Sequence, residues 1–345
     1  MKDFTNCQYR FFGSAGKASI FFFLIIFLSG CSRLGSYNRS IPLLGTIVNI
    51  KISDSSQPDA ICSEAIKRMK DLEKSLSRFD PNSQVSVINN RQPDQAIPIS
   101  DDVYQLLQLS TYLNSISEGA FDITVGPLMK VWGFYSDNKG VRPDESAILA
   151  ALDDVGSDKI SIDDNKNVLK IANPRIELDF SAVAKGYIVD RAAEVLKTGG
   201  VKNAIIDAGG DVLCIGLNNG NDCVVGIRDP RNRRGVIAKI LMRGKAVATS
   251  GGYENFIMLD NKKIPHIIDP RTGYPPNNNV LSATVIADNL ALADGLATSF
   301  YILEPDRSMK IAESLDSVDC IIIAREDGEI KFYISNGIQK DIEIL

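Results

Sequence analysis

The sequence predicts one large α+β domain in which antiparallel strands form sheets and helices pack against them. Strand-like runs occur in hairpin-like groups, for example residues 212–216, 224–228 and 236–241, and do not alternate strictly with helices. The chain has no internal repeat, no low-complexity stretch and no linker long enough to divide it. Its length slightly exceeds that of a usual single core, which a large α+β domain can accommodate.

The beginning of the chain has the pattern of a lipoprotein signal peptide, which we assign to residues 1–30. A basic region precedes an unbroken apolar run over residues 20–28, and Leu28-Ser29-Gly30 stands directly before Cys31. The apolar run is too short for a comfortable membrane span and has the proportions of a signal-peptide core. Small residues before a cysteine resemble a lipobox, so we expect Cys31 to be lipidated.

This pattern divides the chain into a signal peptide, a tether over residues 31–41 and a domain over residues 42–345. It predicts a membrane-anchored lipoprotein of the cell envelope that faces the periplasm or the exterior. The alternative is an uncleaved membrane anchor with an incidental cysteine. In both cases the domain is exported.

The charge balance excludes a nucleic-acid-binding surface of the usual kind. The formal net charge is −5, and loss of the first 30 residues, which carry three basic and one acidic side chain, makes it −7. Proteins that bind nucleic acids through electrostatics are usually basic. An acidic protein that binds a phosphate-rich ligand needs a local device, such as a metal ion, a helix N-terminus or a glycine loop.

The elements of the first half follow from periodicity. Residues 44–52 alternate and are rich in β-branched side chains, which predicts a strand. Residues 58–77 carry apolar side chains at helical spacing, and residues 101–117 form a second helix capped by Ser100 or Asp101. We expect a loop with strand character over residues 118–127. Residues 136–165 are polar and predict turns around a helix at 145–153.

The second half is predicted to alternate between short strands and two helices. We expect the helices at residues 185–198, which end at Gly199-Gly200, and at residues 290–303. Predicted strands cover residues 176–180, 203–207, 212–216, 224–228, 236–241, 282–287, 320–324 and 330–334.

The cysteines outside the N-terminal segment have no metal-site spacing. Cys62, Cys214, Cys223 and Cys320 form no CxxC pair and have no nearby histidine. We expect them to be core residues. A disulfide among them is compatible with an oxidising compartment but cannot be deduced from the sequence.

The only histidine of the chain, His266, begins the stretch His266-Ile-Ile-Asp-Pro-Arg-Thr-Gly273. Proline and glycine in this stretch predict a tight, rigid turn. A hydroxyl- and glycine-rich segment, residues 248–253, lies upstream, and we expect it to be a loop. Together these residues suggest a place where an anionic substrate meets a metal. The alternative is that His266 caps a turn or fills a polar gap.

Asp294 and Thr298 are four positions apart in the last predicted helix, so they share one face. A carboxylate and a hydroxyl are hard oxygen donors that suit Mg²⁺, and they leave room for phosphate oxygens and water. The alternative is an ordinary polar helix face on which Thr298 bonds to a carbonyl.

Asp179 and Lys185 bracket a predicted strand-to-helix turn made of small residues. Small residues allow a ligand to approach the backbone, and the helix N-terminus offers free N–H groups to an anion. The alternative is that Ser181 or Asp179 caps the helix while Lys185 is solvated. Gly209-Gly210-Asp211 is a tight turn and lacks the spacing of a dinucleotide-binding fingerprint.

Several motifs in this order resemble those of the ApbE-type FAD:protein FMN transferases, and the resemblance extends from about Leu44 to Leu303. The matching motifs are Leu44-Gly45-Thr46, residues 76–83, residues 119–127, residues 179–186, residues 207–211, Thr249-Ser250-Gly251, residues 266–273 and residues 293–298.

The resemblance implies a fold often called T-fold-like, with a central cleft that binds a bent FAD. It also implies the residues of the site, by motif. The FAD would be lined by Leu44, Phe79, Ala120, Phe121, Asp122, Asp179, Lys185 and Ile268. The Mg²⁺ would be held by the backbone carbonyl of Ala182 and the side chains of Asp294 and Thr298.

The implied activity is Mg²⁺-dependent transfer of FMN from FAD to a Ser or Thr hydroxyl of an exported acceptor protein, such as a membrane redox subunit, with release of AMP. We expect His266 to act as the general base, with Asp294 as the rival. Two other classes remain open on the sequence: an Mg²⁺-dependent FAD pyrophosphatase that gives FMN and AMP, and a non-enzymatic FAD-binding lipoprotein.

Overall fold

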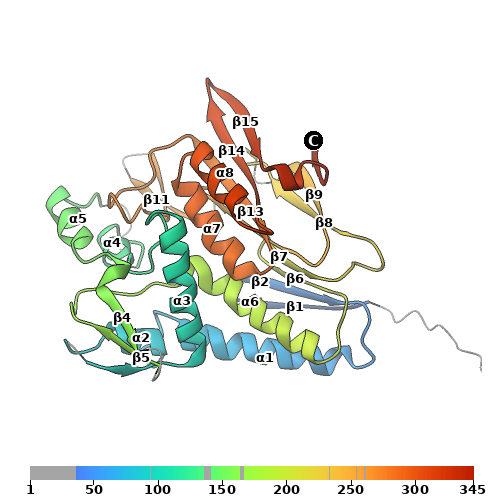
Figure 1. Cartoon of the computed structure of the whole chain (residues 1–345), viewed down its shortest axis with the longest axis horizontal. Helices are drawn as coiled ribbons and strands as arrows, with labels where there is room; N and C mark the ends of the chain where they lie inside the picture. The colour runs from blue at the N-terminus through green and yellow to red at the C-terminus, as the bar shows by residue number, and fades with distance from the viewer. Residues whose placement is uncertain are drawn as a thin grey trace, which may run out of the picture. The chain divides into compact units, whose positions relative to one another are not determined.

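An eight-stranded antiparallel sheet in the order β1-β2-β6-β7-β10-β13-β14-β15 runs through the computed structural model (Figure 1). The model describes residues 36–93, 95–135, 141–163, 167–232, 234–253, 255–259 and 262–345. The strands of this sheet are β1 (Tyr37–Leu43), β2 (Thr46–Ile52), β6 (Ala204–Ala208), β7 (Asp211–Ile215), β10 (Ala246–Gly251), β13 (Val280–Ala287), β14 (Asp319–Glu326) and β15 (Glu329–Ile334).

The central strands β7, β10, β13 and β14 are buried on both faces, because their alternate side chains enter different cores. Ala246 and Ala248 of β10 belong to the main core with the helices, whereas Val247 faces a second core. In β14, Ile322 faces the main core and Ile321 the second. The continuous apolar runs of these strands therefore reflect a sheet covered on both sides.

The second core is closed by a three-stranded sheet in the order β16-β9-β8. Its strands are β8 (Cys223–Arg228), β9 (Val236–Met242) and β16 (Ile342–Ile344). The four cysteines of the described part of the chain are buried free thiols, as expected for core residues.

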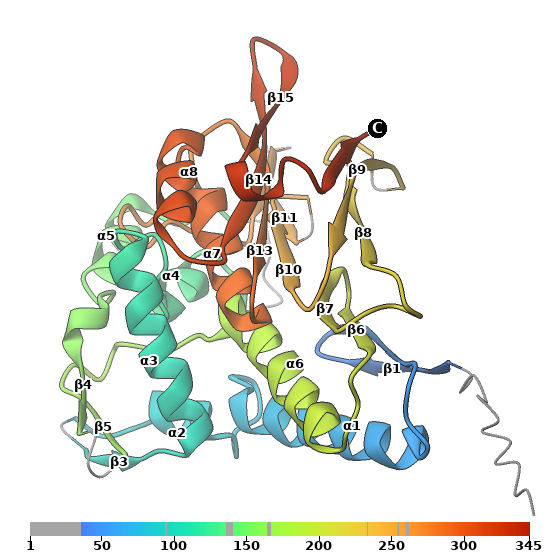
Figure 2. The same cartoon turned by 45° about the vertical axis from the view of Figure 1, so that its right-hand side comes forward.

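Helices cover the opposite face of the large sheet. Helix α7 (Leu290–Ile302) packs against β10 and β13 on one side and against α3 (Asp101–Ile116) and α6 (Ser181–Thr198) on the other, and Figure 2 shows this arrangement. Helix α1 (Pro58–Leu76) packs against α6, and α8 (Pro305–Ser314) packs against β14. None of the helices in the described part is long and apolar enough to cross a membrane.

Smaller elements complete the fold. They are the helices α2 (Gln84–Asn89), α4 (Gly126–Val131) and α5 (Glu145–Leu152), the sheet β3-β5-β4 (Ile97–Pro98, Val168–Ile171, Ile160–Asp163), the hairpin β11-β12 (Phe256–Leu259, Lys262–Pro265) and two 3-10 turns, η1 (Ser157–Lys159) and η2 (Asn336–Ile338). A third core, centred on Trp132 and Ile148, joins α4 and α5 to β11 and Ile268.

The α+β prediction with antiparallel sheets is confirmed, and most predicted elements lie within two residues of the observed ones. One strand was wrong: residues 44–52 were expected to form a single strand, but Leu44 and Gly45 are the turn of the β1-β2 hairpin. Both have positive φ, of 57° and 68°, as a two-residue hairpin turn requires. Strand β1 begins at Tyr37, inside the segment assigned to the tether. The predicted signal peptide and Cys31 lie outside the described residues.

Three further predictions were wrong around the cleft. Residues 176–180 form only an isolated bridge between Glu177 and Val125, and α6 begins at Ser181, four residues earlier than expected. The loop expected from Ala248 is strand β10 up to Gly251, because pairing with β13 through Gly251 outweighs the turn preference of glycine. The loop expected over residues 118–127 ends two residues early, because α4 begins at Gly126.

Candidate functional site

One cavity of about 300 Å³ brings together every predicted site residue except Phe79. Its lining comes from the β1-β2 turn, the loop before α4, the start of α6, the end of β10, the His266 turn and α7. Segments that are far apart in the sequence thus contribute to one cleft. Phe79 lines an adjoining cavity of about 470 Å³, which shares Asp179, Asn255 and His266 with the first.

At one end of the cavity, Asp294 and Thr298 lie on the face of α7 that meets α6. Asp294 is only 7% exposed, and its Oδ2 accepts a hydrogen bond from the Gly186 N–H of α6 at 3.1 Å. Thr298 Oγ1 lies 3.3 Å from Ser250 Oγ of β10. The i,i+4 face predicted from the sequence is therefore formed, and the hydroxyl of β10 extends it.

The donor set at this end fits a hard cation such as Mg²⁺. Ala182 lines the cavity one helical turn before Gly186, whose N–H donates to Asp294, so the start of α6 and the Asp294 carboxylate meet at this end. Asp294 Oδ1 accepts no hydrogen bond from the described residues. Burial raises the pKa of Asp294 to about 7, against the influence of Lys185, and a cation would reverse that shift.

The described part of the chain has no cluster of three or more His, Cys, Asp or Glu side chains in a metal-site arrangement. A cation at the α6–α7 end would therefore bind to one carboxylate, one hydroxyl and one carbonyl. Oxygens of a bound ligand would complete its coordination, as is usual for Mg²⁺.

Lys185 supplies the positive charge nearest to this end. Its Nζ lies 2.5 Å from Asp211 Oδ2, so the lysine predicted as solvated in the alternative interpretation is in fact paired and 30% exposed. Asp211 is buried, and it also accepts a hydrogen bond from the Thr249 N–H at 3.1 Å. The pair fixes the ammonium group of Lys185 in the cavity, where it can neutralise a phosphate.

His266 lines the cavity and is the first residue after β12. Its ring Nδ1 lies 3.1 Å from the carbonyl oxygen of Asn255. Because a carbonyl can only accept, Nδ1 carries the proton and Nε2 keeps its lone pair. Burial lowers the pKa of His266, so the ring is neutral at neutral pH and able to accept a proton.

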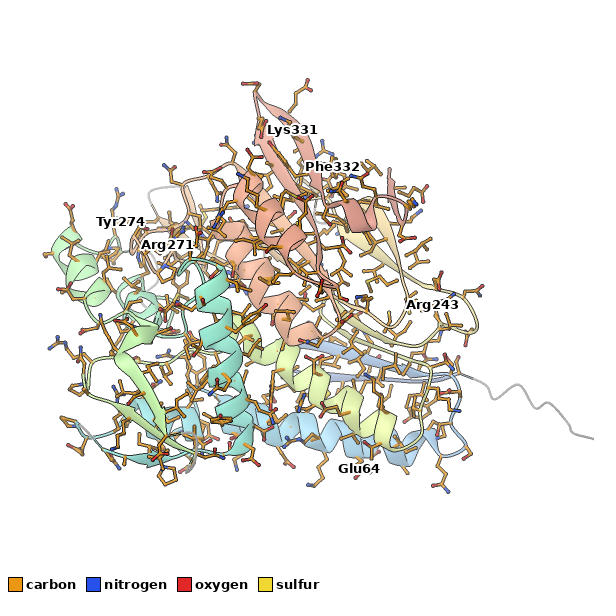
Figure 3. The ribbon with its side chains drawn as sticks, in the orientation of Figure 1. Glu64, Arg243, Arg271, Tyr274, Lys331 and Phe332 are labelled. Atoms are coloured by element: carbon orange, nitrogen blue, oxygen red, sulfur yellow. The ribbon has the colours of Figure 1, made fainter. Side chains whose placement is uncertain are left out.

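The turn that follows His266 is held by several hydrogen bonds. The backbone N–H, Nε and Nη2 of Arg271 donate to the Asp269 carboxylate at 2.9, 2.9 and 2.7 Å. Trp132 Nε1 donates to the Gly273 carbonyl at 2.8 Å. Figure 3 shows Arg271 and Tyr274 close together on the same side of α7. The predicted rigid turn is confirmed, and Asp269 and Arg271 serve to stiffen it.

Both carboxylate oxygens of Asp179 contact neighbouring groups. Its Oδ1 accepts a hydrogen bond at 2.8 Å from the backbone N–H of Ser181, the first residue of α6. The N-cap of α6 is Phe180, so neither Asp179 nor Ser181 occupies the cap position that the alternative interpretation gave them. Asp179 Oδ2 accepts a hydrogen bond from the Tyr135 hydroxyl and lies 3.7 Å from Arg78 Nη1. The Arg78 guanidinium also stacks on the Tyr135 ring, with 3.4 Å between its central carbon and the ring centroid.

Phe79 extends this cluster toward the solvent. It is 72% exposed, and its ring meets that of Tyr135 edge to face, with 6.0 Å between the centroids. An exposed aromatic ring beside a cavity offers a surface on which a flat ligand can stack.

Asp122 lines the cavity, but its carboxylate is already fully hydrogen-bonded. It accepts from the backbone N–H and hydroxyl groups of Thr124 and Ser157 and from Asn114 Nδ2, at distances from 2.6 to 3.1 Å. Asp122 therefore braces the loop that presents Ala120 and Phe121, both of which are buried in the cavity wall. Leu44, whose φ is positive, and Ile268 belong to the same lining.

Several site residues were missed by the sequence analysis. Tyr135 and Asn255 carry no motif of their own, and only the fold brings them to the cleft. Arg78 lies within the motif of residues 76–83, but it was not assigned to the site. Asp211 was interpreted as part of a turn. The available signal was its position directly after two glycines and at the start of a strand. A side chain at such a position can reach a neighbouring loop.

The matches to known proteins cover nearly all of this architecture. The ApbE family model matches residues 44–322, which include every predicted site residue. This chain belongs to the ApbE family. A Vibrio cholerae protein named FAD:protein FMN transferase is 31% identical over 323 residues, which cover 91% of this chain and 95% of that protein. A Haemophilus influenzae protein of the same name is 32% identical, with 83% of this chain and 86% of that protein covered.

Solved ApbE structures have the same fold. The flavin transferase ApbE from Vibrio cholerae matches with a TM-score of 0.80 and 29% identity, covering 89% of this chain and 99% of that one. The ApbE protein from Thermotoga maritima matches with a TM-score of 0.80 and 30% identity, covering 88% and 98%. The ApbE fold therefore accounts for the α+β architecture.

Proposed function

We propose that this ApbE protein transfers the FMN part of FAD to a Ser or Thr hydroxyl of an exported acceptor protein and releases AMP. The observation that carries the proposal is the single cavity in which His266, Lys185 and the Asp294–Thr298 pair lie together. A proton acceptor, a fixed cation and hard oxygen donors are the groups that transfer of a nucleotidyl phosphate needs. The proposal is also supported by relatives named FAD:protein FMN transferase, whose matches cover 91% and 83% of this chain.

The proposed FAD binding uses both ends of the cleft. The flavin would stack near Phe79 and Phe121, and the diphosphate would lie between Lys185 and the start of α6, whose N–H groups favour anions. Leu44, Ala120 and Ile268 would exclude water from the ligand. Asp122 and Asp179 would act mainly by holding the loops around it, because their oxygens already accept hydrogen bonds from the protein.

In the proposed reaction the acceptor hydroxyl attacks the phosphorus on the FMN side of the diphosphate. A new O–P bond forms, the bridging O–P bond breaks, and AMP leaves with the bridging oxygen. His266 Nε2 takes the hydroxyl proton, because its lone pair is free while Nδ1–H is held by Asn255. Asp294 is the weaker candidate for this role, since it is buried and accepts from Gly186.

Ala182, Asp294 and Thr298 are the residues that would hold Mg²⁺, which neutralises negative charge on the phosphate oxygens. Lys185 adds a second positive charge from the side of α6, and Asp211 fixes its direction. The acceptor we propose is an exported flavoprotein, such as a membrane redox subunit. The enzyme itself would be a lipoprotein anchored through Cys31 in the cell envelope, on the evidence of its N-terminal sequence.

The test is intact-mass analysis of an exported flavoprotein domain with an acceptor Thr, after incubation with the mature protein, FAD and Mg²⁺. We expect a mass gain of one FMN on that domain and stoichiometric AMP. AMP with free FMN and no adduct, also on a panel of acceptor domains, would replace the proposal by FAD pyrophosphatase activity. Bound but intact FAD would indicate a carrier.

A further inference from the structure

The contact between α6 and α7 is unusually close at Gly186. A Cβ atom at this position would lie 2.4 Å from the Leu290 carbonyl oxygen and 2.7 Å from Ala291 Cα. Such distances do not occur between real atoms, so only glycine allows the two helix backbones to meet here. The spacing of the helices is therefore fixed by backbone contact at this point.

A buried carboxylate one turn further along α6, that of Asp190, reinforces this contact. Asp190 is 8% exposed, and its two oxygens accept from the Leu290 and Ala291 N–H groups, each at 2.8 Å. Both groups belong to the first turn of α7, where backbone donors have no partner within the helix. Asp190 thus caps α7 from a neighbouring helix.

The linkage is reciprocal, since Asp294 of α7 accepts from the Gly186 N–H of α6. Two carboxylates, one on each helix, therefore hold backbone N–H groups of the other helix. In sequence Ala182 lies four residues before Gly186, and Asp294 lies four residues after Leu290. The contact between Gly186 and Leu290 is thus one helical turn from the Ala182 carbonyl on α6 and one turn from the Asp294 carboxylate on α7. These are the two groups proposed to share a cation.

We infer that Asp190 and Gly186 are positioning residues that set the distance between the Ala182 carbonyl on α6 and the Asp294–Thr298 pair on α7. The inference rests on the proposed function, because it concerns the cation site of that function. Neither residue lines the cavity, so they act on the cation only through the placement of its ligands. Outer groups that orient ligands typically change metal affinity by about 10- to 100-fold.

The variant Asp190→Asn tests this, because it keeps the size of the side chain and replaces one acceptor oxygen by a donor that opposes an α7 N–H group. The matched control is Asn289→Ala. Asn289 also caps α7, through its Oδ1 and the Leu292 N–H at 2.9 Å, and this cap joins α7 only to its own N-terminal residue. Both variants remove a cap of the same helix, and only the first weakens the link between the helices.

Mn²⁺ alone serves as the probe, with the free ion followed by electron paramagnetic resonance in folded protein. We expect Asp190→Asn to weaken Mn²⁺ binding by about 10-fold or more and Asn289→Ala by less than about 2-fold, although both lower the melting temperature. FAD affinity, measured in EDTA by flavin fluorescence, should stay within about 2-fold of wild type in both. Gly186→Ala should weaken Mn²⁺ binding at least as much as Asp190→Asn.

Equal Mn²⁺ affinities for Asp190→Asn and Asn289→Ala would overturn the inference while leaving the proposed function intact. Loss of FAD affinity in step with loss of Mn²⁺ would also overturn it, since that pattern indicates general damage to the cleft. A wild-type protein that binds no Mn²⁺ would instead contradict the cation site itself.

Discussion

The two ends of the cleft are built in different ways. At the α6–α7 end, Asp294 is 7% exposed, lies on a regular helix and is tied to Gly186 of the facing helix. At the other end, Phe79 is 72% exposed and His266 follows a hairpin, so both lie on connecting segments. The closed end can hold charges at fixed distances, whereas the open end can admit a large flat ligand and a protein hydroxyl.

The residues at the two ends are therefore held by different structures: a buried helix pair at the closed end and connecting segments at the open end. Changes at the closed end should affect both stability and catalysis, because buried charges and backbone hydrogen bonds are lost together. Changes at the open end should affect function with little effect on folding.

The largest effect is expected for Asp294. Asp294→Ala should lower the rate of FMN transfer by roughly 1,000-fold, because a preorganised charge next to the reacting phosphate is lost. It should also lower the melting temperature, since the Gly186 N–H loses its acceptor. Steady-state transfer assays with an Mg²⁺ titration, together with thermal melts, measure both effects.

Asp294→Asn is the control for that variant, because it can still accept from Gly186 but carries no charge. It should restore much of the stability and little of the rate. Unchanged Mg²⁺ dependence in either variant would contradict the assignment of Asp294 as a ligand.

The next effect is expected for His266 at the open end. His266→Ala should lower the transfer rate by roughly 100-fold, at the low end of general-base effects, because phosphoryl transfer depends mainly on positioning and charge. FAD affinity should change little. Rapid-quench kinetics and fluorescence titrations separate the two quantities, and an equal loss of both would give His266 a structural role.

A smaller effect is expected for Phe79. Phe79→Ala should weaken FAD binding by about 5-fold, which corresponds to about 1 kcal/mol of aromatic stacking. The melting temperature should not change, because the ring is mostly exposed. Tyr112→Ala is the control, since Tyr112 is an exposed aromatic side chain outside the cleft. Similar FAD affinities for the two variants would exclude stacking on Phe79.

The smallest effect concerns pH. Burial lowers the pKa of His266 in the folded protein below the value of 6.5 that it keeps when unfolded. Between these two values the unfolded chain binds more protons at this side chain, so His266 contributes a rise of stability with pH in the window just below 6.5. The raised pKa of Asp294 contributes the opposite slope in the same window, so the test compares the wild type with a variant. Urea unfolding at several pH values should give a more positive slope in the wild type than in His266→Gln. Parallel slopes would contradict it.

Some features of this protein follow from the sequence because they depend on residues close together in the chain. The shared face of Asp294 and Thr298 follows from the helical repeat, and the tight turn from Asp269 to Gly273 follows from its proline and glycine. The strand at residues 320–324 follows from an apolar run too short for a helix. These features are local, so neighbouring residues are sufficient to specify them.

The tertiary structure decided where separate segments meet. The pairing of Lys185 with Asp211, the contact of Tyr135 with Asp179 and the capping of α7 by Asp190 join residues that no spacing rule relates. The same holds for β10, whose Thr249-Ser250-Gly251 end is a strand because it pairs with β13. Such contacts depend on the summed packing of many side chains in the three cores, so no short stretch of sequence contains them.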